Sequence, residues 1–590
     1  MKKSFVISQQ YLLLPIKAQE ETRQVAFYCE GKKILEFAVP VSDCGAAGDK
    51  AGKQAYAFNY YAPIPMREWM GKEICIEGDV PENFLEAIAF SEEMPDVAQR
   101  RPLIHFSANV GWLNDPNGLM YHDGVYHMFF QYNPCDTRWQ NMSWGHAVSR
   151  DLLHWEQKET ALLPDEDGPM YSGSAIVNEQ GKLGLPRDAE ILFYTCAGSS
   201  SKWSEGKKYV QKIAYSTDGK TFQKREGCVL ENVAGENRDP KVYWHEGKQV
   251  YYMALFLEGY DYAIFNSGDL EHWEMTQRLS LPNARECPDL QKVPVEGGGY
   301  KWMFWGADGY YFLGDFDGSR FETDGVQHNA YQTMLPYAAQ TFWGTDRVIM
   351  VPWMRTDNKG KVFTSVMGVP RQLSLVKKGD DFILRQKLAD EFENSKERVL
   401  EQSLAGGEVT YRQEKEAALE VKLYPQKGAG FEVNLYGTVL TMEPGSGRII
   451  IGGVAERGGH IKGDTVLAFD KERLASEQIS RESLAAAGFS LEGLDEEIPR
   501  PVWGKATKEE FKQFREKVAK MPSWADAGIR VLETGADPES ISILTDGEVL
   551  EITVDEGLVS DAYETVTDVL CGEVKVKVQG DVKVEISQIP

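Results

Sequence analysis

The chain has 590 residues, of which 42% are hydrophobic and 11% aromatic, so it can build several packed domains and is not a disordered protein. Lysine and arginine total 64 against 90 aspartate and glutamate residues, which gives a formal net charge of −26. A field of this sign repels phosphate backbones and anionic lipids, so it excludes nucleic acid and membrane surfaces as expected partners. A neutral ligand such as a sugar is not opposed.

The N-terminus does not read as a signal peptide, because Gln9, Gln10 and Lys17 interrupt its short apolar stretches. No run of about 18 apolar residues predicts a membrane span. The eight cysteines are scattered, with no CxxC pair and no Cys/His metal spacing. This pattern favours buried, reduced thiols in a cytoplasmic protein over disulfides, with a secreted protein that has lost its signal as the alternative.

Residues 1–97 predict a small N-terminal accessory β domain. Short strand patterns occur at 25–28 and 34–39, and residues 91–96 have the composition of a linker. The domain could bind substrate, make an oligomer contact or simply pack, and packing is the default interpretation.

Residues 102–385 repeat one pattern, a short turn followed by an aromatic-rich alternating strand. A second element, Ser-x-Asp in a turn with an aromatic residue four positions beyond the aspartate, follows several of these strands. Self-similar strand groups at intervals of roughly fifty to seventy residues are typical of propeller blades. We therefore expect an all-β protein with a five-bladed β-propeller, the alternative being an ordinary β-sandwich with coincidental turns. The strands lie at residues 125–132, 190–195, 249–255, 300–305 and 347–353.

Residues 395–590 predict a C-terminal β-sandwich, from strand patterns at 419–423, 541–544 and 574–578. A helical insert is expected near 465–520, where Thr507 can cap a helix and Glu510 occupies the capping-box position.

Three carboxylates have unusual local settings. Asp115 lies in an Asn-Asp-Pro-Asn-Gly turn, Asp239 in Arg-Asp-Pro and Glu286 in Arg-Glu-Cys-Pro, and each is expected just before a blade strand. Because inner strands of a propeller converge on a central channel, the three side chains can meet there. Each motif alone is weak, since Asx-Pro turns often only shape loops.

Glycoside hydrolysis requires such a set. A retaining enzyme holds a carboxylate nucleophile and a carboxylic acid about 5–5.5 Å apart, on either side of the anomeric carbon. The acid must stay protonated until it reaches the leaving oxygen, so we expect burial or a nearby negative charge to raise its pKa.

Six short motifs follow one another along residues 102–375: Trp112-Leu113-Asn114-Asp115-Pro116-Asn117-Gly118, Gln131-Tyr132-Asn133-Pro134, Tyr171-Ser172-Gly173-Ser174, Arg238-Asp239-Pro240, Glu286-Cys287-Pro288 and Gly368-Val369-Pro370-Arg371-Gln372-Leu373. This ordered series resembles glycoside hydrolase family 32, which includes invertases, levanases and inulinases. The resemblance implies a five-bladed propeller followed by a β-sandwich, with no metal or organic cofactor. It also implies release of terminal non-reducing β-D-fructofuranosyl units from sucrose, fructo-oligosaccharides or fructans.

Carried over by position, the resemblance makes Asp115 the nucleophile, Asp239 the transition-state stabiliser and Glu286 the acid/base. A thiol at Cys287, beside the acid/base, either tunes its pKa or simply packs. Further candidates for contact with the terminal fructose are Asn114, Gln131, Trp139, Ser172 and Arg238, with Trp305 and Tyr337 as wall aromatics that could equally be blade core.

The sequence departs from the family pattern at three places. Leu113 and Tyr171 stand where methionine and phenylalanine are usual, and the segment at 335–341 lacks the aspartate of the family's Asp-Phe-Tyr-Ala stretch. The last departure leaves open the substrate beyond the terminal fructose. Chain-length and linkage preference, exo or endo action and a homo-oligomeric state also stay open.

Three other functions remain. A fructosyltransferase uses the same carboxylates but transfers fructose to a sugar instead of water. A non-catalytic fructan-binding protein would have lost turnover, although all three carboxylates are present. Another five-bladed propeller family cleaves arabinosides or xylosides, often as inverting enzymes with wider carboxyl spacing.

Overall fold

The computed structural model describes residues 1–42, 55–455, 530–535, 537–566 and 568–589. The helical insert predicted near 465–520 lies outside these residues. Two compact units are found: one holds Met1–Arg101, Phe106–His328 and Tyr337–Leu373, and the other holds Pro102–His105, Asn329–Pro336 and Ser374–Pro590. The predicted three-domain division stays a prediction. None of the helices within the described ranges has the length and apolar character needed to cross a membrane.

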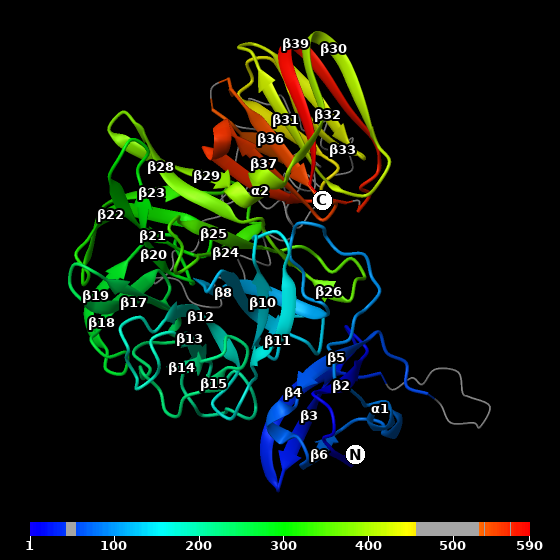
Figure 1. Cartoon of the computed structure of the whole chain (residues 1–590), viewed down its shortest axis with the longest axis vertical. Helices are drawn as coiled ribbons and strands as arrows, with labels where there is room; N and C mark the ends of the chain where they lie inside the picture. Colours follow the sequence, from blue (N-terminus) through cyan, green and yellow to red (C-terminus); the bar gives the residue numbers. More distant parts are fainter. Residues whose placement is uncertain (43–54, 456–529, 536, 567, 590) are drawn as a thin grey trace, which may run out of the picture. The chain divides into compact units, whose positions relative to one another are not determined.

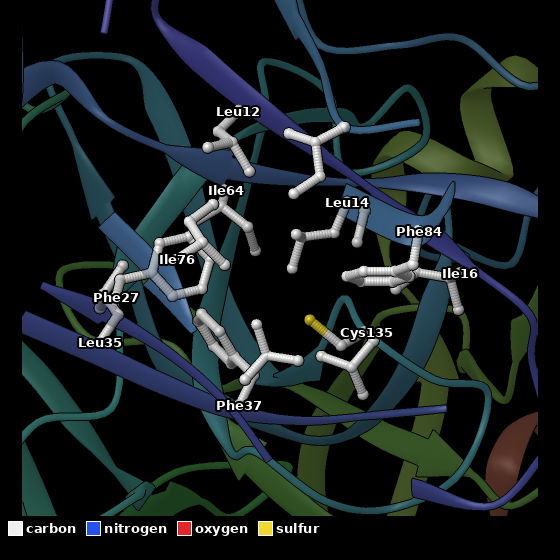
Figure 2. Packing of buried hydrophobic residues seen from close by; sticks show 14 of the residues in the cluster. Leu12, Leu14, Ile16, Phe27, Leu35, Phe37, Ile64, Ile76, Phe84 and Cys135 are labelled. Atoms are coloured by element: carbon white, nitrogen blue, oxygen red, sulfur yellow. The ribbon is translucent and has the colours of Figure 1, made fainter. Parts of the chain in front are cut away.

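The N-terminal segment forms two antiparallel sheets, β1-β6-β3-β4 and β5-β2-β7, around one hydrophobic core. Leu12 and Leu14 of one sheet meet Phe27 and Phe37 of the other there, all fully buried. The thiol of Cys135 packs into this core, although it belongs to a loop of the following domain (Figure 2). The elements are β1 (Lys2–Val6), β2 (Tyr11–Ile16), β3 (Thr22–Cys29), β4 (Lys32–Pro40), β5 (Tyr60–Pro65), η1 (Arg67–Trp69), β6 (Glu73–Gly78), α1 (Glu82–Glu86) and β7 (Ala89–Ser91).

After the N-terminal segment the chain forms a series of antiparallel sheets, most of whose strands follow one another in chain order (Figure 1). Their faces pack on each other: Trp144 of one sheet and Leu192 of the next share a buried cluster, and so do Ile191 and Met253 of the next pair. The short strand β26 returns to pair in parallel with β8, so the end of the series joins its beginning. This arrangement is a β-propeller.

The sheets have the strand orders β11-β10-β9-β8-β26, β12-β13-β14-β15, β16-β17-β18-β19, β20-β21-β22-β23 and β24-β25-β28-β29, with β27 paired to β25. The strands are β8 (Gly111–His122), β9 (Val125–Asn133), β10 (Ser143–Ser149), β11 (Glu156–Leu162), β12 (Met170–Val177), β13 (Glu190–Cys196), β14 (Val210–Ser216), β15 (Gln223–Lys224), β16 (Arg238–His245), β17 (Val250–Glu258), β18 (Asp261–Ser267), β19 (Glu274–Ser280), β20 (Asp289–Pro294), β21 (Tyr300–Trp305), β22 (Tyr310–Phe316), β23 (Phe321–Asn329), β24 (Pro336–Thr341), β25 (Ile349–Met354), β26 (Phe363–Thr364), β27 (Val366–Met367), β28 (Arg371–Lys378) and β29 (Asp381–Leu388).

The aromatic strands predicted from the repeat are confirmed as β9, β13, β17, β21 and β25. They are second strands of their sheets, because each is preceded by an inner strand that carries a motif. Asp239, expected just before a strand, is instead the second residue of β16. The expectation that Asp115 lies in a turn before the first blade strand is also wrong. It lies within β8, where bulges between Leu113 and Pro116 and between Asn117 and Met120 accommodate the turn-like composition.

The Ser-x-Asp elements are built alike at the ends of β10, β14 and β18. In the first, Ser149 Oγ donates to Asp151 Oδ1 at 3.0 Å, and the same oxygen accepts the backbone N–H groups of Leu153 and His154. Asp218 and Asp269 repeat the pattern. These aspartates cap tight turns between outer strands, which explains their recurrence.

The second unit contains a ten-stranded antiparallel sheet with the order β35-β34-β33-β32-β39-β31-β36-β37-β38 and with β30 paired to β39. The long strand β39 pairs with β32 through its first half and with β31 through its second, so it links two groups of strands around one apolar core. The elements are α2 (Asp390–Ser395), β30 (Glu397–Gln413), β31 (Ala418–Pro425), β32 (Gly430–Leu435), β33 (Thr438–Met442), β34 (Arg448–Gly452), β35 (Arg530–Glu533), β36 (Ile541–Thr545), β37 (Val549–Val554), η4 (Asp555–Gly557), β38 (Val559–Glu564) and β39 (Gly572–Ile589).

A buried charge cluster anchors the segment Pro102–His105 to this unit. His105 lies 2.9 Å from Asp546 Oδ2 and 3.1 Å from Glu551 Oε1, with its side chain fully buried. Burial would lower the pKa of His105, but the two carboxylates outweigh it and raise the pKa to about 10. The imidazole is therefore charged at neutral pH.

The seven described cysteines form no disulfide, as the scattered spacing predicts. Only four of them are buried, namely Cys29, Cys135, Cys196 and Cys287.

Candidate active site

The three predicted carboxylates come together in the structure at the beginnings of inner strands. Asp115 lies near the start of β8, Asp239 is the second residue of β16, and Glu286 precedes β20 by three residues. Ser172, near the start of β12, donates from Oγ to Asp115 Oδ2 at 2.7 Å. Inner strands of four neighbouring sheets thus supply one site.

A single thiol connects two of the acids. Cys287 Sγ lies 3.6 Å from Asp115 Oδ2 and 3.6 Å from Asp239 Oδ2, and its backbone N–H donates to Asp239 Oδ2 at 3.0 Å. Burial raises the pKa of Cys287, and the charges of the neighbouring acids add to this effect, so the sulfur stays a neutral thiol. It acts as a hydrogen-bond donor shared by the two carboxylates.

Glu286 is held by two other side chains. Arg238 Nη2 contacts its Oε1 at 2.5 Å, and the Tyr337 hydroxyl donates to its Oε2 at 2.6 Å. Burial alone would raise the pKa of Glu286, but Arg238 and Tyr337 lower it below its ordinary value. The raised pKa expected for an acid is therefore not found in this state of the site, because both contacts favour the ionised carboxylate.

The other two carboxylates behave in the opposite way. Burial raises the pKa of Asp115, although hydrogen bonds from Ser172 and Asn114 oppose it. Burial also raises the pKa of Asp239 to about 7, against the opposing charge of Arg238, and the negative charge of Asp115 adds to the rise. Three acids so close together titrate as a set.

The backbone of the site is strained. Asp239, Glu286, Cys287 and Ala338 have φ angles of 63°, 49°, 37° and 49°, in the left-handed region that favours glycine. Such conformations cost on the order of 1–3 kcal/mol each and persist only where surrounding structure enforces them. At the consecutive residues Glu286 and Cys287, the first side chain reaches Arg238 and the second reaches the carboxylates of Asp115 and Asp239.

A buried network supplies that enforcement. Lys241 Nζ of β16 lies 3.1 Å from Asp289 Oδ2 of β20 and donates to the carbonyl of Thr341 in β24 at 2.8 Å. Thr341 donates its own N–H and hydroxyl to the same aspartate oxygen, each at 2.8 Å. Three inner strands are thereby fixed together beside the carboxylates.

The other residues predicted to contact the sugar lie in different environments. Trp139 is 53% exposed at the rim and packs edge-to-face on Tyr171 at 6.0 Å. The Asn114 side chain accepts from Trp112 Nε1 at 2.8 Å. Gln131 is buried and donates to the Met170 carbonyl at 2.9 Å, so its amide supports the strand that carries Ser172.

Trp305 is 1% exposed and stacks on Tyr311 at 5.9 Å. Its burial counts against a place on a sugar-binding wall and favours the blade-core alternative. Tyr337, in contrast, reaches Glu286 directly.

Sequence reasoning missed Arg355. Its guanidinium lies 4.3 Å from the centre of the Tyr337 ring and 5.9 Å from that of Trp353. Burial lowers the pKa of Arg355, and the charges of Asp115 and Glu286 oppose this, so Arg355 is a second cation of the site. The sequence did contain a signal for Arg355, because this residue directly follows β25, the strand predicted as the last copy of the repeat.

One group among the described residues brings possible metal ligands within 4.8 Å of one another, Asp269, Glu271 and His272. It belongs to a solvent-exposed Ser-x-Asp turn and contains none of the three carboxylates discussed above. His272 Nδ1 is already hydrogen-bonded to Asp269 at 2.8 Å, which is a structural role.

Acids gathered on the inner strands of a β-propeller, with arginines and aromatic rings around them, define the type of site that glycoside hydrolases use. Residues 105–387 match the family described as "Glycosyl hydrolases family 32 N-terminal domain". The matched part of the chain, residues 105–387, is a glycoside hydrolase family 32 domain, as its motifs indicated.

Known proteins with similar sequences carry related names. The chain is 34% identical over 330 residues to a levanase of Bacillus subtilis, covering 49% of this chain and 48% of the levanase. It is 37% identical over 285 residues to an invertase of Debaryomyces hansenii, covering 43% and 52%. The matched region thus spans about half the length of these relatives.

A solved structure extends the likeness in fold. The exo-inulinase of Aspergillus awamori superposes with a TM-score of 0.63 at 22% identity, covering 83% of this chain and 98% of the exo-inulinase. At this identity the match supports the fold, a propeller with a further β domain.

Proposed function

We propose that the chain is a retaining glycoside hydrolase that releases terminal non-reducing β-D-fructofuranosyl units from sucrose, fructo-oligosaccharides or fructans. The observation that carries the proposal is the meeting of Asp115, Asp239 and Glu286 around Cys287 and Arg238. The similarity to a levanase and an invertase supports the choice of sugar.

In the first step, Glu286 gives its proton to the oxygen of the leaving group while the bond from that oxygen to the anomeric carbon breaks. A carboxylate oxygen of Asp115 forms a bond to the anomeric carbon, which leaves a fructosyl ester and a free alcohol. Ser172 holds the attacking carboxylate in place from Oγ. Asp239 accepts hydrogen bonds from fructose hydroxyls and stabilises the positive charge that develops on the ring.

The low pKa of Glu286 must rise before this step. Arg238 contacts Glu286 at 2.5 Å, and the resemblance assigns the same arginine to the sugar. When sugar hydroxyls bind the Arg238 guanidinium in place of Glu286 and exclude water, the effect of burial on the pKa of Glu286 dominates. Glu286 then becomes protonated. Substrate binding and protonation of Glu286 are therefore coupled.

In the second step, Glu286 removes a proton from water, and the resulting hydroxide attacks the anomeric carbon of the ester. The bond to Asp115 breaks, fructose with retained configuration leaves, and both acids return to their starting state.

The proposal also includes the number of propeller blades and the form of the second β domain. The sheets that begin with β8, β12, β16, β20 and β24 are five blades of one propeller, supported by their consecutive strand orders and by the β26–β8 pairing. The β domain of the second unit is a sandwich whose two layers share β39, as its split pairing supports.

The test is a product profile with sucrose, 1-kestose, inulin and levan. Release of fructose as the main product supports the proposal. Longer oligomers that form faster than free fructose would establish a fructosyltransferase, and fructan binding with no release would establish a binding protein. Arabinose release from an aryl arabinofuranoside, with sucrose left intact, would establish the other propeller families.

A further inference from the structure

A polar groove of about 450 Å³ lies between strands of the N-terminal sheets and loops of the propeller. Its volume is within the range of about 300–1,000 Å³ typical of small-molecule sites. We call it the polar groove. Its lining includes Gln24 and Glu36 from β3 and β4, Gln140 and Asn141 from the loop before β10, and Ser200 and Trp203 from the loop after β13.

The two walls of the groove are joined firmly. Ala38 of β4 and Asn141 exchange two hydrogen bonds, each 2.8 Å long. The backbone N–H of Gln19 donates to Asp136 at 3.1 Å, and the Cys135 thiol is inserted in the N-terminal core (Figure 2). The loop 134–141 is therefore held by both the N-terminal sheets and the propeller. The same loop carries Trp139 at the rim of the catalytic site.

A row of aromatic side chains connects the catalytic site with the groove. Trp139 packs on Tyr171 at 6.0 Å, and Tyr171 packs on Tyr209 at 5.8 Å. The Tyr209 hydroxyl is hydrogen-bonded to Ser200 Oγ at 2.8 Å, and Ser200 lines the groove. Gln140, another lining residue, directly follows Trp139.

The row of aromatic rings starts beside the catalytic carboxylates. Tyr171 precedes Ser172, the partner of Asp115. Burial raises the pKa of Tyr171, and the charge of Arg238, the residue bonded to Glu286, opposes this rise. The row of aromatic rings therefore leads from the catalytic carboxylates to the polar groove.

The chemistry of the lining suits an uncharged polyhydroxyl ligand. Amides and hydroxyls can both donate to and accept from sugar hydroxyls, and an indole offers an apolar face. Lys33 lies 5.3 Å from the Trp203 ring centre and pairs with Glu36 at 2.5 Å. These two contacts hold the Trp203 and Glu36 side chains in place. The lining contains three carboxylates, Glu36, Asp165 and Glu205, against one lysine, Lys202, and this balance disfavours an anionic ligand.

From this geometry we propose that the polar groove binds the sugar units of a fructan chain beyond the cleaved bond, so that the N-terminal sheets contribute to substrate length preference. The inference rests on the proposed function and deepens it. Fructo-oligosaccharides and fructans are then preferred over sucrose, whose leaving group is too short to reach the groove.

The test compares kcat/KM for sucrose, nystose and inulin in the full chain and two variants, Trp203→Ala and Gln24→Ala. Each variant should lower kcat/KM for nystose and inulin by about fivefold relative to sucrose, as loss of one sugar contact predicts. Gln24 is exposed, so its replacement leaves the fold intact. Trp69→Ala, a loss of tryptophan from the N-terminal segment outside the groove, is the matched control and should leave the ratio unchanged.

The outcomes separate the two proposals. An unchanged ratio of fructan to sucrose turnover in both groove variants, with sucrose still hydrolysed, would overturn the groove and leave the proposed function standing. If kcat/KM fell equally for sucrose, nystose and inulin in both variants, including Gln24→Ala, the groove proposal would also be overturned. Absence of fructose release from every substrate by the unmodified chain would reject the proposed function itself.

Discussion

The hydrogen bond between Tyr337 and Glu286 offers a direct test of how the acid is controlled. The Tyr337→Phe variant removes a hydroxyl that donates to Glu286 Oε2 at 2.6 Å and keeps the ring that Arg355 contacts. Because this bond favours the ionised carboxylate, its loss must make Glu286 easier to protonate. The pKa of the acid rises in the variant.

The size of the expected rise in the pKa of Glu286 follows from the type of hydrogen bond that is removed. A hydrogen bond to a charged group contributes about 1.5–3 kcal/mol. The lower figure applies because the Glu286 side chain is 33% exposed and solvent screens its charge. About 1.5 kcal/mol corresponds to a tenfold rise in proton affinity, since about 1.4 kcal/mol is one factor of ten.

The assay is the pH dependence of kcat/KM for sucrose. Its alkaline limb reports the acid of the free enzyme, so Tyr337→Phe should move that limb to higher pH by about one unit. The matched control is Tyr262→Phe, because the Tyr262 hydroxyl contacts the backbone carbonyl of Glu286 and not the carboxylate. An alkaline limb that stays in place, or moves to lower pH, in Tyr337→Phe would refute the reasoning.

Three further variants test the remaining assignments. Asp115→Asn should reduce turnover by about 10³-fold or more without changing the unfolding temperature, and substantial residual activity would exclude Asp115 as nucleophile. Glu286→Ala should lose about 10²–10⁴-fold on sucrose but recover on fructosides with activated leaving groups, and equal losses on both would contradict the acid role. His105→Gln should lower the free energy of unfolding by about 3 kcal/mol, because it leaves Asp546 and Glu551 buried without their cation. The raised pKa of His105, about 10 against an ordinary 6.5, means that its stabilisation is complete below pH 6.5 and disappears as pH rises through 10. Urea unfolding at several pH values should show this alkaline loss in the unmodified chain only; the same loss in His105→Gln would disprove the assignment.

The sequence predicted the second strand of each of the propeller sheets. Alternating aromatic residues after short turns gave β9, β13, β17 and β21 nearly to their ends. The prediction of Asp115 in a turn was wrong because Asn, Asp, Pro and Gly also occur in bulged strands, and only pairing with β9 distinguishes the two.

The sequence by itself determined the identity of the three carboxylates, because each stands in a short motif whose composition is local. Tertiary structure decided how they behave. It placed Cys287 between two acids, brought Tyr337 and Arg238 onto the third, and buried Trp305. Proton affinity and exposure depend on neighbours that are distant in the chain, and a local pattern does not contain them. The insertion of Cys135 into the N-terminal core is a contact of the same kind.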